Sequence, residues 1–161
     1  MKSAASLLGL LVAQATSAAP ASGPTPQMMA PIRALSACMA SGLPSSCALP
    51  FASRGVSVAE NFPPYLFAGK DAVGRWAHGF RQHIAAAGDQ KLSVEFGTAL
   101  DFSQDRGRTY FSLPTRWCGV SHGRRFEERG AWSFVLVESA GQYRILGYAW
   151  GVTDLRETPS P

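Results

Sequence analysis

Alternating apolar and polar residues mark the second half of the sequence as a sheet. Between Leu92 and Phe102 every second side chain except Thr98 is apolar, which is the period of a half-buried strand. Strands joined by tight turns form an antiparallel meander, and one face of such a sheet needs a cover. Short turn sequences separate this first stretch from three further strand-like ones, at residues 108–120, 125–138 and 142–152.

Helical spacing in the first half of the sequence supplies that cover. Apolar residues recur every three or four positions from Met28 to Met39, which predicts a helix. We expect this helix to begin near Ala30, because Pro31 is tolerated only in the first turn. A short second helix is predicted at residues 43–52.

Residues 56–77 predict a strand, a turn and the start of a long helix. The strand, at residues 56–60, ends in Glu60, and a Pro-Pro pair then stops further pairing. A strand that ends in an acid and leads into an amphipathic helix is suited to form the wall and floor of a pocket. The helix is predicted over residues 70–87, with an apolar face made of Val73, Trp76, Ala77, Phe80 and Ile84.

The first residues predict export. Lys2 is followed by an apolar run at residues 7–13 and then by small residues, the pattern of a secretory signal peptide over residues 1–21. We expect cleavage near Ala18 or Ala21 and a periplasmic or secreted protein. The run is shorter than the ~20 apolar residues of a spanning helix, so no membrane anchor is predicted. The remaining chain is predicted to form a flexible leader at residues 22–27, a domain at 28–152 and a tail at 153–161.

The charge of the chain changes this picture little. The formal net charge is +4, and several arginines gather around the later hairpins. Such a cluster could bind nucleic acid or another anionic surface. Basic residues at hairpin ends are more often simply solvated, and we expect no nucleic-acid partner.

The three cysteines fit an oxidising compartment, where disulfides persist. Cys38 and Cys47 enclose a short loop and are predicted to pair. Cys118 is then left as a buried thiol in an apolar strand. No histidine or second cysteine stands at zinc-like spacing from any of them, so we expect no metal site, and nothing in the sequence points to another cofactor.

Several segments carry a resemblance to a known superfamily, namely Glu60-Asn61-Phe62-Pro63-Pro64-Tyr65, Gly69-Lys70-Asp71-Ala72, Trp76, Trp132-Ser133-Phe134-Val135-Leu136, Tyr143-Arg144-Ile145 and Tyr148-Ala149-Trp150. Together with the order of the predicted elements, they resemble exported bacterial members of the nuclear transport factor two-like, or SnoaL-like, superfamily. The resemblance implies an α+β fold, a cone-shaped, curved antiparallel sheet packed against N-terminal helices. Members often dimerise through the sheet, so the resemblance also implies a homodimer.

Within that superfamily, ketosteroid isomerase uses a strand carboxylate to move a proton next to a carbonyl, and the resemblance places this base on Glu60. The partner groups do not carry over. The position of the isomerase's hydroxyl donor holds Leu35, and its protonated acid falls among residues 131–133. Without such donors an enolate loses its electrostatic stabilisation, so we do not expect a steroid isomerase.

Glu60 is the candidate general base, because burial by neighbouring aromatic residues would raise its pKa toward a useful range. The alternative is a strand-end acid that pairs with an arginine or caps backbone amides. Some candidate pocket residues would equally serve as ordinary core, and His83 as a packing residue. Glu127, Glu128 and Arg129 could supply polar pocket groups, but we expect them mainly in solvent-facing ion pairs. The candidate pocket residues are Tyr65, Trp76, His83, Tyr110, Trp117, Trp132, Tyr148 and Trp150.

Two functions fit these observations. The first is binding of a small, largely apolar molecule in the pocket, or association with a partner protein through the outer face of the sheet. The second is an isomerase, cyclase or dehydratase with Glu60 as general base. The sequence contains no Ser-His-Asp arrangement, phosphate-binding loop or dinucleotide fingerprint, so hydrolase, kinase and Rossmann functions have no support.

Overall fold

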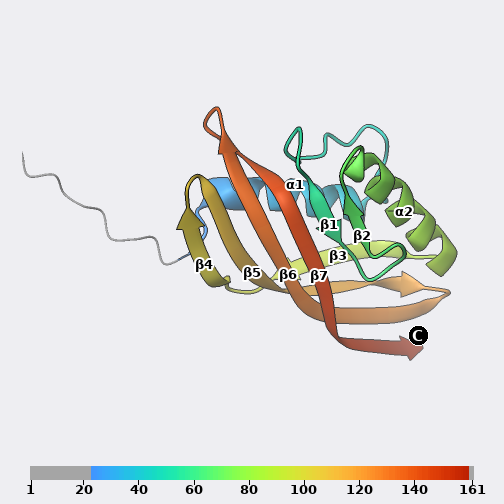
Figure 1. Cartoon of the computed structure of the whole chain (residues 1–161). Helices are drawn as coiled ribbons and strands as arrows, with labels where there is room; N and C mark the ends of the chain where they lie inside the picture. Colours follow the sequence, from blue (N-terminus) through green and yellow to red (C-terminus); the bar gives the residue numbers. More distant parts are fainter. Residues whose placement is uncertain (1–22, 160–161) are drawn as a thin grey trace, which may run out of the picture.

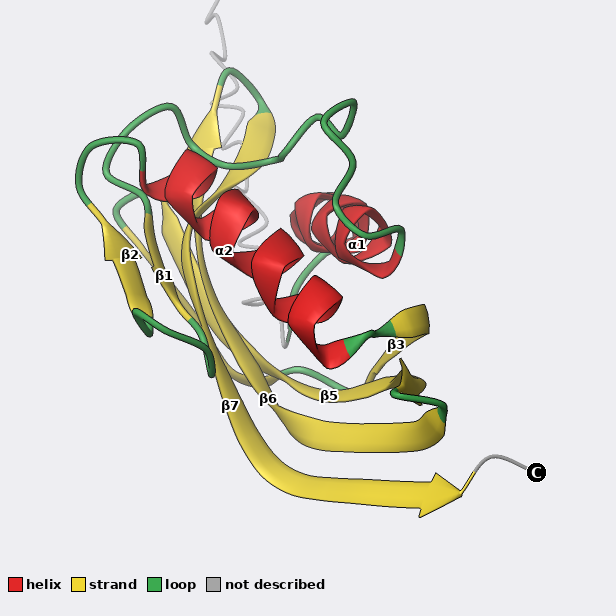
Figure 2. Ribbon diagram, turned by 90° about the vertical axis from the view of Figure 1, so that its right-hand side faces the viewer, coloured by secondary structure: helices red, strands yellow, loops and turns green. Residues whose placement is uncertain are grey.

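A curved sheet with two helices inside its curve makes up residues 23–159, the part of the chain that the computed structural model describes (Figures 1 and 2). The strand order is β2-β1-β7-β6-β5-β3, and β4 also pairs with β5. This confirms the predicted α+β fold. The elements in chain order are α1 (Pro26–Ala40), β1 (Ser57–Ala59), β2 (Leu66–Ala68), α2 (Ala72–Ala87), β3 (Gln90–Phe96), β4 (Leu100–Asp105), β5 (Arg108–Ser121), β6 (Arg124–Ser139) and β7 (Gln142–Pro159).

The predicted signal peptide, residues 1–21, lies outside the described residues. Between residues 23 and 159, neither helix has the length and apolar character needed to cross a membrane.

The first helix, α1, begins earlier than the sequence predicts. The hydroxyl oxygen of Thr25 accepts a hydrogen bond from the backbone N–H of Met28 at 3.4 Å, and Pro26 takes the first helical position, where its missing N–H costs nothing. Pro31 therefore lies inside the helix, with its ring buried. The predicted start near Ala30 is wrong, and the predicted flexible leader ends at the Thr25 cap.

The predicted helix at residues 43–52 is absent. The end of this segment instead runs beside β7, where the Ala52 N–H donates to the Ile145 carbonyl and the Ile145 N–H donates to the Pro50 carbonyl, each at 2.9 Å. Pro44 and Pro50 have no N–H to contribute to a helix, and the pairing with β7 satisfies the backbone groups that a helix would have used.

A disulfide between Cys38 and Cys47, with a Cα–Cα distance of 5.9 Å, ties the end of α1 to this segment. The third cysteine, Cys118, is half-buried rather than the buried thiol expected from its apolar strand. Side chains along its strand alternate between the two faces of the sheet, and the neighbouring Trp117 occupies the buried face.

The predicted single strand at residues 92–102 is two strands. β3 and β4 both pair with β5, and residues 97–99 between them leave the ladder. The break lies opposite Pro114, whose carbonyl accepts a hydrogen bond from the Gly97 N–H at 2.7 Å. Because Pro114 has no N–H to donate the next hydrogen bond of the ladder, the edge strand is interrupted there.

The last strand, β7, is longer than predicted. We expected it to end at Val152 and to be followed by a tail at residues 153–161, but it pairs with β6 as far as Pro159, which lies opposite Arg124. An exposed ion pair between Arg124 and Glu157, with N and O 3.4 Å apart, joins these strand ends. Mostly polar side chains in this extension hide the strand period from a sequence pattern.

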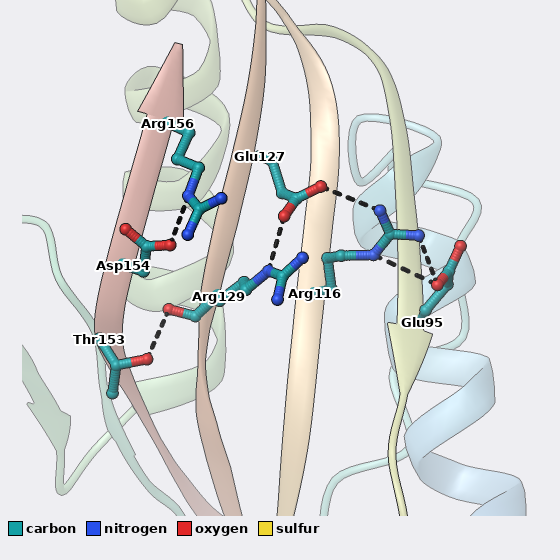
Figure 3. Close-up of polar contacts among 7 residues, drawn as sticks. All are labelled: Glu95, Arg116, Glu127, Arg129, Thr153, Asp154 and Arg156. Atoms are coloured by element: carbon teal, nitrogen blue, oxygen red, sulfur yellow. Dashed lines mark hydrogen bonds and ion pairs between the residues drawn. The ribbon is translucent and has the colours of Figure 1, made fainter.

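Charged side chains cover the sheet face that turns away from the helices (Figure 3). Arg116 on β5 binds Glu95 on β3 at 2.6 Å and Glu127 on β6 at 2.9 Å, and Arg129 binds Glu127 at 2.6 Å. Arg116 and Arg129 therefore lie within strands, in the ion pairs expected for Glu127 and Arg129, and not at hairpin tips. Asp154 and Arg156 on β7 pair at 2.8 Å.

The position of the site depends on β1. This strand pairs antiparallel with β2, which the sequence did not predict, and parallel with β7, where Ala59 lies opposite Ala149. Glu60 follows β1 directly and is thereby placed beside the middle of β7, the part that carries Tyr148 and Trp150. The core between this part of the sheet and the helices contains Ile32, Leu35, Val58, Trp76, Phe111, Trp132, Phe134 and Ile145.

The long strands β6 and β7 bend as they pass under the helices (Figure 2). Their ladder is irregular between Arg129 and Gly130. A Cβ on Gly130 would lie 2.1 Å from the Gly151 carbonyl oxygen, whereas a Cβ on Gly151 would meet nothing closer than 4.0 Å. The two strands thus approach so closely at Gly130 that no side chain fits.

We therefore expect Gly130→Ala to destabilise the protein, by about 1–3 kcal/mol, because the two backbones must separate to admit the methyl group. Gly151→Ala on the adjacent strand is the matched control, and its effect should be small. Urea unfolding of both variants measures the difference. Equal free energies of unfolding for the two variants would show that the approach at Gly130 does not constrain the fold.

Candidate functional site

A cavity of about 70 Å³ lies between the C-terminal half of α2 and the helix-facing side of the sheet. A single buried water needs about 10–15 Å³ in such a measure, so the space is that of a small molecule. Its apolar and aromatic walls are Met39, Phe62, Phe80, Ile84, Leu92, Trp117, Phe126, Trp132 and Trp150. Its polar lining consists of Glu60, Asn61, His83, Asp89 and Glu128.

Glu60 is the most buried of these polar residues, with 8% of its surface exposed. The indole Nε1 of Trp76, on α2, donates a hydrogen bond to its Oε1 at 3.0 Å. The hydroxyl of Tyr148, on β7, donates to the same oxygen. Two side-chain donors therefore fix one carboxylate oxygen and orient the group at the cavity wall.

Burial raises the pKa of Glu60 to about 7, because a desolvated carboxyl group prefers its neutral form. The nearby charge of Glu128 acts in the same direction, while the hydrogen bonds from Tyr148 and Trp76 oppose the rise. The pKa of Tyr148 is raised well above its usual value, also chiefly by burial. Glu60 can thus gain or lose a proton near neutral pH, whereas Tyr148 stays protonated.

Glu128, on β6, is the second carboxyl group in the cavity lining. Its Oε1 accepts hydrogen bonds from Trp150 Nε1 at 2.7 Å and from Asn61 Nδ2 at 3.2 Å. Burial raises the pKa of this carboxyl group, the hydrogen bond from Trp150 and the charge of His83 lower it, and Asp89 raises it. The chain therefore places two acids with raised pKa values around one small space.

One buried donor in the wall has no acceptor. The Nε1 of Trp132 is the single fully buried side-chain nitrogen or oxygen in residues 23–159 without a hydrogen-bond partner, although only 1% of the residue is exposed. Buried polar groups are normally paired. The Trp132 residue also lines the cavity, so this unsatisfied N–H belongs to the cavity wall.

Four of the eight predicted pocket residues line the cavity, and two more contact Glu60. His83, Trp117, Trp132 and Trp150 line the cavity with Glu60. His83 is exposed at the edge and stacks on Phe62, with ring centroids 4.9 Å apart. Trp76 and Tyr148 do not line the cavity, but both donate hydrogen bonds to the Glu60 carboxyl group.

Two predicted pocket residues lie elsewhere. Tyr65 is 60% exposed in the turn between β1 and β2, where its φ of 69° follows from the tight turn. Tyr110 is 38% exposed on β5, and its hydroxyl is 3.2 Å from Ser112 Oγ. Its neighbour Phe111 takes the buried position, so strand alternation excludes Tyr110 from the cavity.

Sequence reasoning assigned Glu128 to a solvent-facing ion pair, and this was wrong. Glu127 makes those ion pairs, while Glu128 points to the opposite face of β6. The signal was present in the alternation, because Glu128 has the same parity as Phe126 and the buried Trp132. The role of Asn61 had no such signal, since it depends on a loop reaching across to β6.

No group of three or more His, Cys, Asp or Glu side chains within residues 23–159 has a geometry that could hold a metal ion.

Comparisons with known proteins give likeness in structure only. No protein-family model and no curated protein matches the sequence. Among solved structures, a candidate calcium/calmodulin-dependent protein kinase II association domain from Xanthomonas campestris has a TM-score of 0.63 at 14% identity, over 89% of this chain and 98% of that one. A candidate scytalone dehydratase from Novosphingobium aromaticivorans has a TM-score of 0.60 at 10% identity, over 81% and 85%.

A candidate ketosteroid isomerase from Shewanella frigidimarina is similar to the same degree, with a TM-score of 0.59 at 12% identity over 78% of this chain and 94% of that one. At these identities the likeness concerns the fold.

The raised pKa of Glu60 predicts a pH-dependent stability. The folded chain holds a proton on Glu60 up to about pH 7, whereas the unfolded chain releases it near 4.5. The free energy of unfolding should therefore fall as the pH rises through this window. Glu60→Gln removes the charge and keeps an acceptor for Tyr148 and Trp76. Between pH 5 and pH 8 the unchanged chain should lose about 2–3 kcal/mol relative to this variant.

Urea unfolding at both pH values measures this loss. Glu127→Gln, on the exposed face, is the control and should not reproduce it. Parallel pH profiles for the unchanged chain and Glu60→Gln would contradict the raised pKa.

Proposed function

We propose that this cavity, which lies between the helices and the curved sheet of the nuclear transport factor two-like fold, binds a small, largely apolar carbonyl compound and that Glu60 moves a proton on it. The reaction class is that of an isomerase or dehydratase. The observation that carries the proposal is the buried Glu60 carboxyl group in the cavity wall, whose pKa is about 7. A general base works best when its pKa lies near the operating pH.

The hydrogen bonds of Glu60 leave room for this role. Both side-chain donors contact Oε1, and the backbone N–H of Asn61 is a further donor to the carboxyl group, so no side-chain donor occupies Oε2. In the proposed step the C–H bond next to the carbonyl breaks and its proton goes to Glu60. The electron pair moves onto the carbonyl oxygen as an enolate. Glu60 then returns the proton either to a carbon of the same molecule, which is an isomerisation, or to a β-hydroxyl group that leaves as water while the enolate electrons form the new C=C bond, which is a dehydration.

An enolate needs a donor aimed at its oxygen, since such electrostatic stabilisation is usually the largest part of catalysis. Trp132 is the candidate, because its buried Nε1 has no partner among the described residues and its ring lines the cavity. The volume of about 70 Å³ favours a molecule much smaller than a steroid.

The likenesses to a candidate scytalone dehydratase and a candidate ketosteroid isomerase agree with this class of chemistry. Export after cleavage near Ala18 or Ala21 and a homodimer formed through the charged face of Figure 3 remain predictions that accompany the proposal.

The proposed proton transfer can be measured as hydrogen exchange. We expect the full chain in D₂O to speed the loss of the α-proton NMR signals of a small ketone such as 4,4-dimethylpentan-2-one. The rate should rise as the pH passes about 7 and Glu60 loses its proton. Glu60→Gln should reduce the rate by a factor of about 10²–10⁴, the usual contribution of a general base.

Glu127→Gln is the matched control and should keep the full rate. Binding without catalysis gives a different result. The ketone then raises the melting temperatures of the unchanged chain and of Glu60→Gln, and neither protein accelerates the exchange. Equal exchange rates with and without the Glu60 carboxyl group would overturn its role as base.

A further inference from the structure

The charged side chains that line the cavity are acids. Glu60, Asp89 and Glu128 line it together with His83, and the lining contains no lysine or arginine. The chain as a whole carries a formal net charge of +4, so the charge of the cavity lining is opposite in sign to that of the whole chain. An anionic substrate would meet like charges there whenever these acids are ionised, which disfavours its binding.

Three tryptophans wall the same space. Trp117, Trp132 and Trp150 come from the neighbouring strands β5, β6 and β7. The ring centroid of Trp132 lies 5.9 Å from that of Trp117 and 6.4 Å from that of Trp150, with interplanar angles of 54° and 74°. The rings are thus inclined to one another rather than stacked, and the electron-rich faces of such rings attract cations.

Glu128 is held against this aromatic wall. It lies opposite Trp117 in the β5–β6 ladder, and its Oε1 accepts the hydrogen bonds from Trp150 and Asn61. Within residues 23–159 its Oε2 has no hydrogen-bond partner. A carboxylate with one oxygen fixed and the other unused, beside indole rings, is an arrangement suited to an organic cation.

We propose that the ligand of this cavity is a small organic cation, an amine or quaternary ammonium compound that also bears a carbonyl oxygen. The cationic group lies among the three indole rings beside Glu128, and the carbonyl oxygen accepts the hydrogen bond of Trp132 Nε1. The inference rests on the proposed function, because it names the class of carbonyl compound on which Glu60 acts.

A pair of ketones with the same shape and different charge tests the inference. Acetonyltrimethylammonium carries a quaternary nitrogen where 4,4-dimethylpentan-2-one has a carbon atom. Calorimetric titration of the full chain at pH 8 and low salt should show the cation binding at least ~10-fold more tightly than its neutral counterpart, a cation–π and carboxylate contribution of the usual size. Added NaCl should reduce this ratio, because it screens the attraction to Glu128.

Glu128→Gln keeps the acceptor for Trp150 and Asn61 but removes the charge. It should abolish most of the preference for the cation and leave binding of the neutral ketone within about 3-fold. Glu127→Gln, one residue away on the opposite face of β6, should keep the preference. Circular dichroism establishes that both variants are folded, and the comparison of the two ketones on the unchanged chain does not depend on any variant.

The outcomes separate this inference from the proposed function. Equal or tighter binding of the neutral ketone would overturn the inference, while proton exchange that depends on Glu60 would still support the proposed function. A clear preference for the cation, together with a proton-exchange rate that Glu60→Gln does not change, would support the inference and overturn the role of Glu60 in the proposed function. Where neither ketone binds, tetramethylammonium is titrated alone, and failure of that titration also overturns the inference.

Discussion

Burial of the Glu60 carboxyl group between Trp76 and Tyr148 joins three segments that are far apart in the sequence. Glu60 follows β1, Trp76 lies on α2, and Tyr148 lies on β7. A buried carboxyl group without donors would cost several kcal/mol, so these two hydrogen bonds are a condition for placing an acid here. The parallel pairing of β1 with β7 supplies the geometry, and the raised pKa and the shape of the cavity both depend on it.

The sheet keeps two charged systems apart. On its outer face arginines and glutamates neutralise one another in ion pairs that water screens, and such pairs contribute little to stability. On its inner face the acids lie among aromatic rings, where each charge is felt strongly. Glu127 and Glu128 illustrate the contrast, because adjacent residues of one strand have a lowered and a raised pKa, respectively.

Much of the fold could be predicted because its signals are local. The 3.6-residue period of α2, the tight turns of the meander and the acid after β1 all depend on near neighbours. The failures depend on partners distant in the sequence. Pro114 on β5 interrupts the strand predicted at residues 92–102, and pairing with β6 keeps the mostly polar residues 153–159 in a strand. The same holds for the site. The residues around Glu60 in the sequence were enough to predict it as a pocket acid, whereas predicting the role of Glu128 required a correct assignment of the two faces of β6.

The 88 residues that separate Glu60 from Tyr148 also affect the order of folding. The helices and hairpins involve contacts between residues near in sequence, which form quickly. The pairing of β1 with β7 closes a long loop, and the entropy cost of closing that loop slows its formation. Until β7 docks, Glu60 lacks the Tyr148 hydroxyl and remains an ordinary hydrated acid. The buried environment of Glu60 is therefore complete only once β1 and β7 have paired.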